Sequence, residues 1–529
     1  MRAALSIGLL LLGCSSSEAA PSLVDAGAPL PDASAAIAEA GGPTPILDYP
    51  PGPYGTGAVG EKLANFRVQG YAMSPTQRDS TRLPFRDISL EEVRSKPGCT
   101  CLMIVWTGAG QGCQPCSEAD GAVGAGVVND ESICALEVVS QSFDSFEIGH
   151  NRNQPAPATR SDLDVFTQTG RQPFPVGLLT DDAMDKLGAG GRIGIPSTVV
   201  VRASDMRIAG MIFGRADSLV ADAKALCAAP LEGVQTLARG IAPRALALDP
   251  THAYVADGAG RIVRVGRTGG ALEALATTDG VPTTIALAGS EVYWSTATTI
   301  GVASKNGTGA RVLLTSPPDV TIGSIASDGE HVYFTRSDGQ VRSVKIANGD
   351  EATLAANEAG PTSIQVDATA VYWLDVDSGE VASWAKNAGP RVSLIEAWPD
   401  HRASIVLGGD LLYVREEGNI SRFDQFVAVP KNGGPTKLVA QVGPTLAFDY
   451  DATTTYLDFA ISAFDRTPND TAIGYVGSGT PELNQPIVNY PQMMTLGRRW
   501  LSAVASGNDG YVYWTTNAPE GGALERMKR

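Results

Sequence analysis

The sequence predicts a multidomain protein in which an α/β domain is followed by a larger all-β domain built from repeats. Three observations lead to this fold class. At 529 residues, the chain is long enough for two or more domains. From about residue 49 to residue 230, apolar runs typical of strands alternate with segments of helical pattern. From residue 231 onward, a short apolar and aromatic strand recurs with a period of ~40 residues.

The formal net charge of the chain is −17, which bears on its partners. Nucleic acids and anionic membrane surfaces are bound through basic patches, so this charge argues against both. No apolar run of the sequence is long enough to span a bilayer. We therefore expect protein partners and no nucleic acid.

Residues 1–13 are predicted to be a lipoprotein signal peptide. A short positive start precedes an apolar run, and the segment Leu11–Cys14 is similar to the bacterial lipobox, whose cysteine becomes lipidated. The alternative is an ordinary signal peptide with a coincidental cysteine at this position. Residues 14–48 are rich in Ala, Pro, Ser, Gly and Asp, which predicts a disordered tether. We expect an extracytoplasmic protein, anchored to a membrane by a lipid on Cys14 and lying on the periplasmic side or at the cell surface.

The α/β domain is predicted to span residues 49–230. Its strand and helix patterns follow the order β-α-β-α-β, then a β-β hairpin and a closing helix. The expected strands are Leu102–Trp106, Ala135–Ser140, Phe174–Leu179, Ser197–Arg202 and Met206–Phe213, and the expected helices are Cys116–Val128, Ser161–Thr169, Asp181–Leu187 and Ala216–Ala228.

A C-x-P-C motif, Cys113 to Cys116, lies between the first expected strand and the first expected helix. The positive end of a helix stabilises a thiolate, and a second cysteine three residues on can resolve a mixed disulfide. Half of a zinc site would have the same spacing, but no second C-x-x-C or H-x-x-H pair completes one. The motif therefore favours a redox site with Cys113 as nucleophile and Cys116 as resolving thiol. The alternative is that this pair is a permanent disulfide.

Three features make this domain similar to the extracytoplasmic thioredoxin-like proteins of the TlpA-type thiol:disulfide interchange group. They are the C-x-P-C motif, the segment Gly194–Thr198 and the hairpin that begins at Met206. The resemblance implies a thioredoxin-like fold with a cis-proline at Pro196 facing the cysteine pair. It also implies a groove in which Ile195 offers backbone hydrogen bonds to a partner, the partners being protein thiols or disulfides of the cell envelope. The chain departs from the family at Gly112, where an aromatic residue is usual.

Four further cysteines lie in the same domain, and the repeats contain none. In an extracytoplasmic protein they are candidates for two structural disulfides, although connectivity cannot be deduced from sequence. These candidates are Cys99, Cys101, Cys134 and Cys227.

The repeats predict a seven-bladed β-propeller over residues 231–529. Each unit contains an apolar strand, an apolar and aromatic strand, a turn with Gly and two further strands, as in a propeller blade. The seventh unit lacks its fourth strand, and the segment near 234–238 can supply it and so close the ring. The sixth unit is irregular. The recurring aromatic strands are His252–Val255, Glu291–Trp294, His331–Phe334, Ala370–Trp373, Leu411–Val414, Thr454–Leu457 and Tyr511–Trp514.

The repeats show no catalytic constellation. The histidines are scattered, with two of them at equivalent strand entries. The segment Asp375–Gly379 is similar to a calcium loop, but a tight turn requires the same residue types. We expect no metal and no cofactor.

Three function hypotheses follow. The first is a membrane-anchored thiol–disulfide oxidoreductase whose propeller binds a protein partner on one face. The second is a non-catalytic binding or scaffold lipoprotein whose cysteines all form structural disulfides. A third, weaker hypothesis gives the propeller hydrolase or lyase activity, which would require convergent carboxylates or histidines at its central channel.

Overall fold

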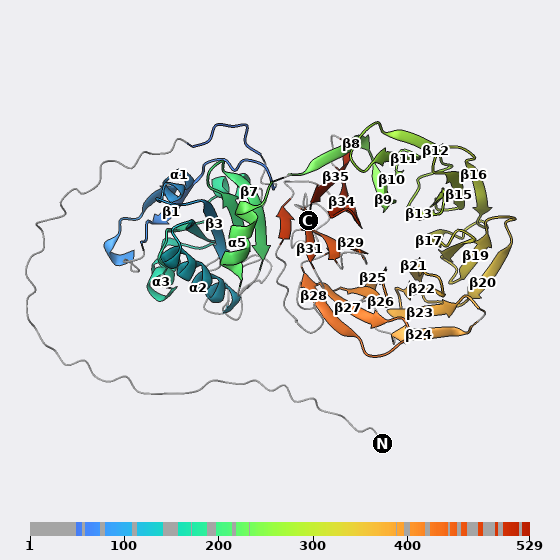
Figure 1. Cartoon of the computed structure of the whole chain (residues 1–529). Helices are drawn as coiled ribbons and strands as arrows, with labels where there is room; N and C mark the ends of the chain where they lie inside the picture. The colour runs from blue at the N-terminus through green and yellow to red at the C-terminus, as the bar shows by residue number, and fades with distance from the viewer. Residues whose placement is uncertain are drawn as a thin grey trace, which may run out of the picture. The chain divides into compact units, whose positions relative to one another are not determined.

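The structure is a computed structural model of the whole chain (Figure 1). It describes residues 49–55, 59–74, 80–107, 114–140, 157–170, 172–187, 197–213, 218–231, 233–387, 389–395, 402–417, 424–442, 445–451, 456–462, 474–479, 492–495, 501–517 and 521–528. In this part of the chain, no helix is both long and apolar enough to cross a membrane. The predicted signal peptide and tether lie outside the described residues.

The first seven strands form one mixed sheet with the order β2-β1-β5-β4-β3-β6-β7. β3 pairs in parallel with β4 and antiparallel with β6, and both β3 and β4 are buried along their whole length. Strands buried on both faces read as continuous apolar runs, which is why the sequence marks them clearly. The bounds are β1 Arg67–Tyr71, β2 Arg86–Ser89, β3 Cys101–Thr107, β4 Ile133–Val139, β5 Val176–Leu178, β6 Ser197–Arg202 and β7 Arg207–Phe213.

Helices pack against this sheet, and their ends follow local rules. The helix α1 begins after Ser89, whose hydroxyl accepts a hydrogen bond from the Glu92 amide at 3.2 Å. Gly126 lets α2 lie close to α5, because a Cβ atom there would stand 2.8 Å from the Val220 side chain. The bounds are η1 Ser80–Arg82, α1 Leu90–Arg94, α2 Gln114–Asn129, α3 Arg160–Gly170, α4 Asp181–Lys186 and α5 Leu219–Ala228.

Six separate four-stranded antiparallel sheets form the blades of a β-propeller. Figure 1 shows the first strand of each of blades 1 to 5 toward the ring centre and the fourth toward the rim. Blade 1 is β9 Pro243–Leu248, β10 His252–Asp257, β11 Arg261–Gly266 and β12 Glu273–Thr277, and blade 2 is β13 Thr284–Ala288, β14 Glu291–Ser295, β15 Thr299–Ser304 and β16 Arg311–Thr315. Blade 3 is β17 Ile322–Ser327, β18 His331–Arg336, β19 Val341–Lys345 and β20 Glu351–Ala355, and blade 4 is β21 Pro361–Val366, β22 Ala370–Asp375, β23 Glu380–Ala385 and β24 Arg391–Ile395.

The last two blades differ in how the chain builds them. Blade 6 takes its fourth strand, β8, from the segment that precedes blade 1, and β8 pairs antiparallel with β35. This is the ring closure predicted near residues 234–238. Blade 5 is β25 Arg402–Gly408, β26 Leu411–Glu416, β27 Asp424–Pro430 and β28 Lys437–Val442, and blade 6 is β33 Leu501–Ser506, β34 Tyr511–Thr516, β35 Gly522–Lys528 and β8 Gln235–Ile241.

The predicted count of seven separate blades is wrong. The four strands between blades 5 and 6 do not form a sheet of their own, because β32 pairs with β7 at Met493 and Met211 and so joins them to β1–β7. The result is one eleven-stranded sheet. This region coincides with the irregular sixth unit of the sequence. The four strands are β29 Thr445–Asp451, β30 Tyr456–Ser462, β31 Gly474–Gly479 and β32 Gln492–Thr495.

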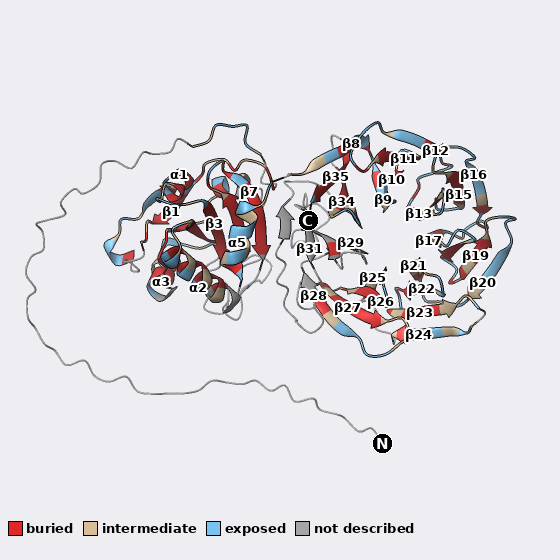
Figure 2. Cartoon of the chain, in the orientation of Figure 1, coloured by how far each residue is buried: buried red, intermediate tan, exposed pale blue. Residues whose placement is uncertain are grey.

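Figure 2 shows buried positions along the strands of the α/β layer and along those of the propeller. The hydrophobic core also crosses the predicted domain boundary. One continuous cluster of buried side chains includes Leu102 and Trp106 of β3 together with Phe426 and Trp514 of the propeller. Because both a sheet and a core are shared, the α/β layer is not a separate domain as predicted. The exact boundary at residues 230 and 231 stays a prediction.

Candidate functional site

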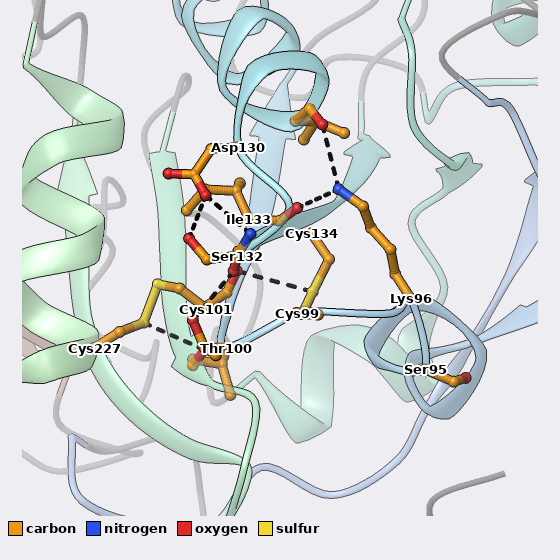
Figure 3. Close-up of a disulfide and its surroundings, with 12 residues drawn as sticks. Ser95, Lys96, Cys99, Thr100, Cys101, Asp130, Ser132, Ile133, Cys134 and Cys227 are labelled. Carbon is orange, nitrogen blue, oxygen red and sulfur yellow. Dashed lines mark hydrogen bonds between the residues drawn. A yellow bond between two sulfur atoms is a disulfide. The ribbon is translucent and has the colours of Figure 1, made fainter. Parts of the chain in front are cut away.

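Two disulfides staple one end of the α/β layer. Cys99 is bonded to Cys134, and Cys101 is bonded to Cys227. Cys101 and Cys134 begin or nearly begin the adjacent strands β3 and β4, and Cys227 lies in α5, so the two bonds join three elements. Figure 3 shows both bonds close to the start of β3. They involve the four cysteines that the sequence marks as candidates for structural disulfides.

Polar contacts surround the two disulfides. The Lys96 ammonium donates hydrogen bonds to the carbonyl oxygens of Val127, at 3.2 Å, and Ile133, at 2.7 Å (Figure 3). Val127 lies in the last turn of α2, where carbonyl groups lack helical partners, and a cation there is favourable. Asp130 accepts hydrogen bonds from the Ser132 amide and hydroxyl. This end of the layer is therefore fixed by covalent and polar contacts, as suits a structural region.

The predicted catalytic pair is only partly described. Cys116 lies in α2, is 3% exposed and is disulfide-bonded. The other predicted functional residues, Cys113, Ile195, Pro196 and the lipidation site Cys14, lie outside the described residues. Their roles stay predictions. Burial of Cys116 in a disulfide fits a structural bond as well as the resting state of a redox pair.

A buried pair of carboxyl groups lies one turn along α2 from Cys116. Asp120 and Glu137 are 4% and 0% exposed, and Glu137 also accepts a hydrogen bond from the Thr107 hydroxyl at 2.8 Å. Burial raises the pKa of Asp120 to about 7. Burial and the neighbouring Asp120 charge raise the pKa of Glu137 well above its usual value. Sequence reasoning missed Glu137, although a lone acidic residue inside the apolar run Ile133–Val139 was the available signal.

The calcium-like segment Asp375–Gly379 contains an ion-pair network instead of a metal site. The Arg391 guanidinium contacts the carboxylates of Glu358 at 2.8 Å, Glu380 at 2.9 Å and Asp375 at 3.2 Å. A cation therefore already occupies the place where these carboxylates converge. Burial and the adjacent Glu358 raise the pKa of Asp375 to about 8. Within the described ranges, no group of three potential ligands is arranged to hold a metal ion.

The histidines offer no catalytic arrangement in the described part of the chain. His252 and His331 begin the equivalent strands β10 and β18, and their rings lie beside Tyr254 and Tyr333 of the same strands. This repetition indicates a packing role in each blade. His150 and His401 lie outside the described residues. The third hypothesis, a catalytic site in the propeller, gains no support from these positions.

The lysines of the ring gather at one end of the blades. Each of the six lysines after residue 231 lies close to the turn between the third and fourth strands of a blade. It ends the third strand, comes directly after it, or begins the fourth strand. Third strands end where fourth strands begin, so these lysines share one end of the ring, which we call the lysine end. They are Lys305, Lys345, Lys386, Lys431, Lys437 and Lys528.

The opposite end, which we call the lysine-free end, is formed by the loops that follow second strands and precede first strands. Backbone hydrogen bonds between loops fix it, such as Ile322 N to Ala297 O at 2.8 Å. Its loops expose Val281 and Val376, which are 47% and 38% exposed. They also expose the carboxylates of three aspartates that pair with no cation among the described residues, namely Asp279, Asp319 and Asp377.

No family model matches the chain, and no curated protein matches it. Solved structures do match. YCF48 from Cyanidioschyzon merolae is 10% identical over 56% of this chain and 98% of its own, with a TM-score of 0.42. The β-propeller domain of Cps50 (Swd1) from Myceliophteria thermophila is 11% identical over 55% and 98%, also with a TM-score of 0.42. A chain of a nidogen/laminin complex is 22% identical over 39% and 81%, with a TM-score of 0.32. At these TM-scores the similarities carry no functional argument.

The predicted membership in the TlpA-type thioredoxin-like group is wrong. No family model matches, and the strands assigned to that domain share their sheet with β29–β32. The motifs that carried the resemblance are short: a cysteine pair, one proline and a hairpin. Motifs this short can match by chance, so they do not establish a family. What stands is a six-bladed propeller with structural disulfides.

Proposed function

We propose that this chain is a non-catalytic binding or scaffold protein whose propeller binds a protein partner. The observation that carries the proposal is the lysine-free end, where rigid loops combine exposed apolar side chains with unpaired carboxylates. Propellers commonly bind partners on one face of the ring, which is an argument from fold alone. The redox hypothesis has less support, because the described cysteines other than Cys116, namely Cys99, Cys101, Cys134 and Cys227, all form structural bonds.

The partner that fits the lysine-free end is a cationic protein segment with apolar side chains. Asp279, Asp319 and Asp377 lie in loops around blades 2 to 4. The arginines that end or neighbour these strands are already engaged, since Arg336 pairs with Asp338 at 2.6 Å and Arg391 pairs with Glu358. The three exposed aspartates therefore leave negative charge available to a partner, and complementary charge favours encounter and correct orientation.

The proposed location is the outside of the cytoplasm. Disulfides form and persist in oxidising compartments, and Cys99–Cys134 and Cys101–Cys227 are among the disulfides of this chain, which supports an extracytoplasmic or otherwise oxidising location. We further propose that Cys14 carries a lipid anchor and that residues 14–48 hold the folded part away from the membrane. The sequence pattern around Cys14 is the support for this finer statement.

Selection of random peptides on the purified chain tests the binding function. We expect enrichment of peptides that combine Lys or Arg with apolar residues. Their dissociation constants should rise roughly tenfold or more in Asp279→Asn/Asp319→Asn/Asp377→Asn, because attraction between charges is lost. A matched variant at the lysine end, Glu330→Gln/Asp350→Asn/Asp410→Asn, should bind as the original chain does. Equal binding by both variants, or capture that requires a free thiol, would contradict the proposal.

A further inference from the structure

A three-residue contact joins neighbouring blades at four junctions of the ring. At three of them, an aspartate five residues before the second-strand tyrosine accepts a hydrogen bond from that tyrosine's hydroxyl, and a lysine of the next blade contacts the same carboxylate. At the fourth, the aspartate stands four residues before the tyrosine and the cation is an arginine. Between blades 3 and 4, Tyr333 Oη lies 2.9 Å and Lys386 Nζ 2.6 Å from Asp328 Oδ2. The lysine also lies 5.5 Å from the centre of the tyrosine ring. We call the place of the aspartate in this contact the acid position and the place of the lysine the cation position.

Two other junctions repeat this geometry. Between blades 4 and 5, Asp367 Oδ2 lies 3.1 Å from Tyr372 Oη and 2.7 Å from Lys431 Nζ. Between blades 1 and 2, Asp249 Oδ2 lies 2.8 Å from Tyr254 Oη and 3.3 Å from Lys305 Nζ. The lysine side chains are each 19% exposed, so the ion pairs are well shielded from water.

The junction between blades 6 and 1 uses arginine. Arg267 Nη2 lies 2.5 Å from Asp509 Oδ1, and Tyr513 donates to Asp509 Oδ2 at 2.7 Å. The Arg267 guanidinium also donates to Tyr513 Oη and Asn508 Oδ1, and its side chain is 5% exposed. Several donors on one planar group hold more acceptors than an ammonium can. This junction lies where the ring closes, beside the strand β8 that blade 6 takes from the segment preceding blade 1.

The junction between blades 2 and 3 lacks the ion pair on both sides. Ala288 stands five residues before Tyr293, at the acid position, and Ile346 stands at the cation position. The equivalence of Ile346 follows from the backbone: its amide bonds to Glu330 O, three residues before a second-strand tyrosine, as Lys386 N bonds to Thr369 O. Ala288 and Ile346 pack against the same core cluster as Tyr293. An apolar pair thus stands where the other junctions have an ionic pair. None of these five junctions combines a charged residue at one position with an apolar residue at the other.

We propose that the acid and cation positions form a matching rule that selects which blade edges can lie side by side. A matched pair is either ionic or apolar. A mixed pair leaves a shielded charge without its partner, which costs more than the pair itself contributes. The burial of Asp328 alone would raise its pKa, yet hydrogen bonds from Lys386 and from backbone amides outweigh this and lower the pKa of Asp328 to about 2. The proposal concerns assembly of the ring and is independent of the proposed binding function.

Substitutions that convert one junction into the other kind test the rule in the full chain. Asp328→Ala and Lys386→Ile each create a mixed junction, and we expect each to speed amide hydrogen exchange in β18 and β22 roughly tenfold. The double variant reproduces the pair Ala288 and Ile346 and should exchange more slowly than either single variant. At the apolar junction, Ile346→Lys should speed exchange, and adding Ala288→Asp should reverse the change.

The control is Lys345→Ile, because Lys345 pairs with Glu330 at 3.6 Å on an exposed surface and occupies neither position. It should leave exchange unchanged. Effects of Asp328→Ala and Lys386→Ile that simply add in the double variant would overturn the proposal. So would failure of Ala288→Asp to rescue Ile346→Lys. If one double variant does not fold, the exchange rates of the double variant at the other junction test the rule independently.

Discussion

Asp120 and Glu137 are the most perturbed acids of the described α/β layer, and their position explains why. Each comes from a different element, α2 or β4, and neither has a cation beside it among the hydrogen bonds and ion pairs of the described residues. Two adjacent buried carboxyl groups cannot both be ionised at low energetic cost, so at least one holds its proton near neutral pH. Asp328 and Asp367 of the propeller junctions are the opposite case, because lysine and amide donors lower the pKa of each carboxyl group.

We predict that the free energy of unfolding falls as pH rises from about 5 to about 8, by roughly 2–4 kcal/mol. The folded chain holds the Asp120 proton more tightly than the unfolded chain does. Its contribution is therefore complete below the unfolded pKa near 4 and is lost as pH rises through about 7. Denaturant titrations at several pH values measure how the free energy of unfolding changes with pH. Hydrogen exchange of the β4 amides then tests whether this change arises in β4. Asp120→Asn should lose most of it, whereas the exposed Glu131→Gln should keep it. A slope unchanged in Asp120→Asn would exclude the pair as its source.

At this scale the sequence was informative about which residues matter but not about their partners. It marked every cysteine, yet the pairing of Cys99 with Cys134 depends on how β3 and β4 align, which no local pattern specifies. Glu137 was not predicted, because an acidic residue in an apolar strand can face solvent. It is exceptional only when both faces of the strand are covered, which the sequence does not show. The ion pairs of the Asp375 segment could not be predicted, because Arg391 comes from another strand.

Among the elements, β3 carries the most constraints, since it pairs with β4 and β6 and is bonded through Cys101 to α5. The two disulfides close loops of different length, with sequence separations of 126 residues for Cys101–Cys227 and 35 for Cys99–Cys134. A longer closed loop restricts the unfolded chain more. The longer cross-link should therefore contribute more stability.

We predict that Cys101→Ala/Cys227→Ala lowers the free energy of unfolding by about 5 kcal/mol at most, and Cys99→Ala/Cys134→Ala by about 4 kcal/mol. Denaturant midpoints for both variants, compared with the oxidised parent chain, provide the measurement. The parent under reducing conditions should be less stable than either variant. A parent chain whose stability is the same with and without reductant would show that neither bond is structural.

Element type was predictable where the pattern was regular, as in the second strands of the blades. β10, β18, β22 and β34 combine a partly exposed first residue with five buried ones, so each reads clearly as a buried strand. The strands β29–β32 were not predictable as part of the other sheet. Their link to it is a strand pairing between residues 211 and 493, far apart in sequence, and only the assembled chain reveals such contacts.

On the scale of the whole molecule, ring closure depends on β8. Leu237 of β8 is 8% exposed and packs in one cluster with Tyr513 and Leu524 of blade 6 and Val263 of blade 1. Thr236 also donates a hydrogen bond to Glu525 at 3.3 Å. The strand therefore connects the first and last blades through both pairing and packing.

We predict that Leu237→Ala destabilises the closed ring by about 2–4 kcal/mol, the usual cost of a buried cavity of this size. Amide exchange in β34 and β35 should accelerate before that of blades 2 to 4, because closure is lost first. Arg239→Ala on the same strand is the control, since that side chain is exposed and should have little effect. Uniform acceleration in all blades would instead indicate that the ring unfolds as one unit.

The matched junctions have a consequence for how such a ring could grow by gene duplication. A copied blade meets its own copy, so its acid position faces its own cation position. Blade 4 offers Asp367 and Lys386, a matched ionic pair, and a tandem copy of it would join without conflict. A copy of blade 3 would set Asp328 against Ile346, and a copy of blade 2 would set Ala288 against Lys305, both mismatched. Blade 1 is matched in the same way by Asp249 and Arg267, so blades 1 and 4 are internally consistent units of duplication, and their edge residues are the ones that lineages with longer rings should retain.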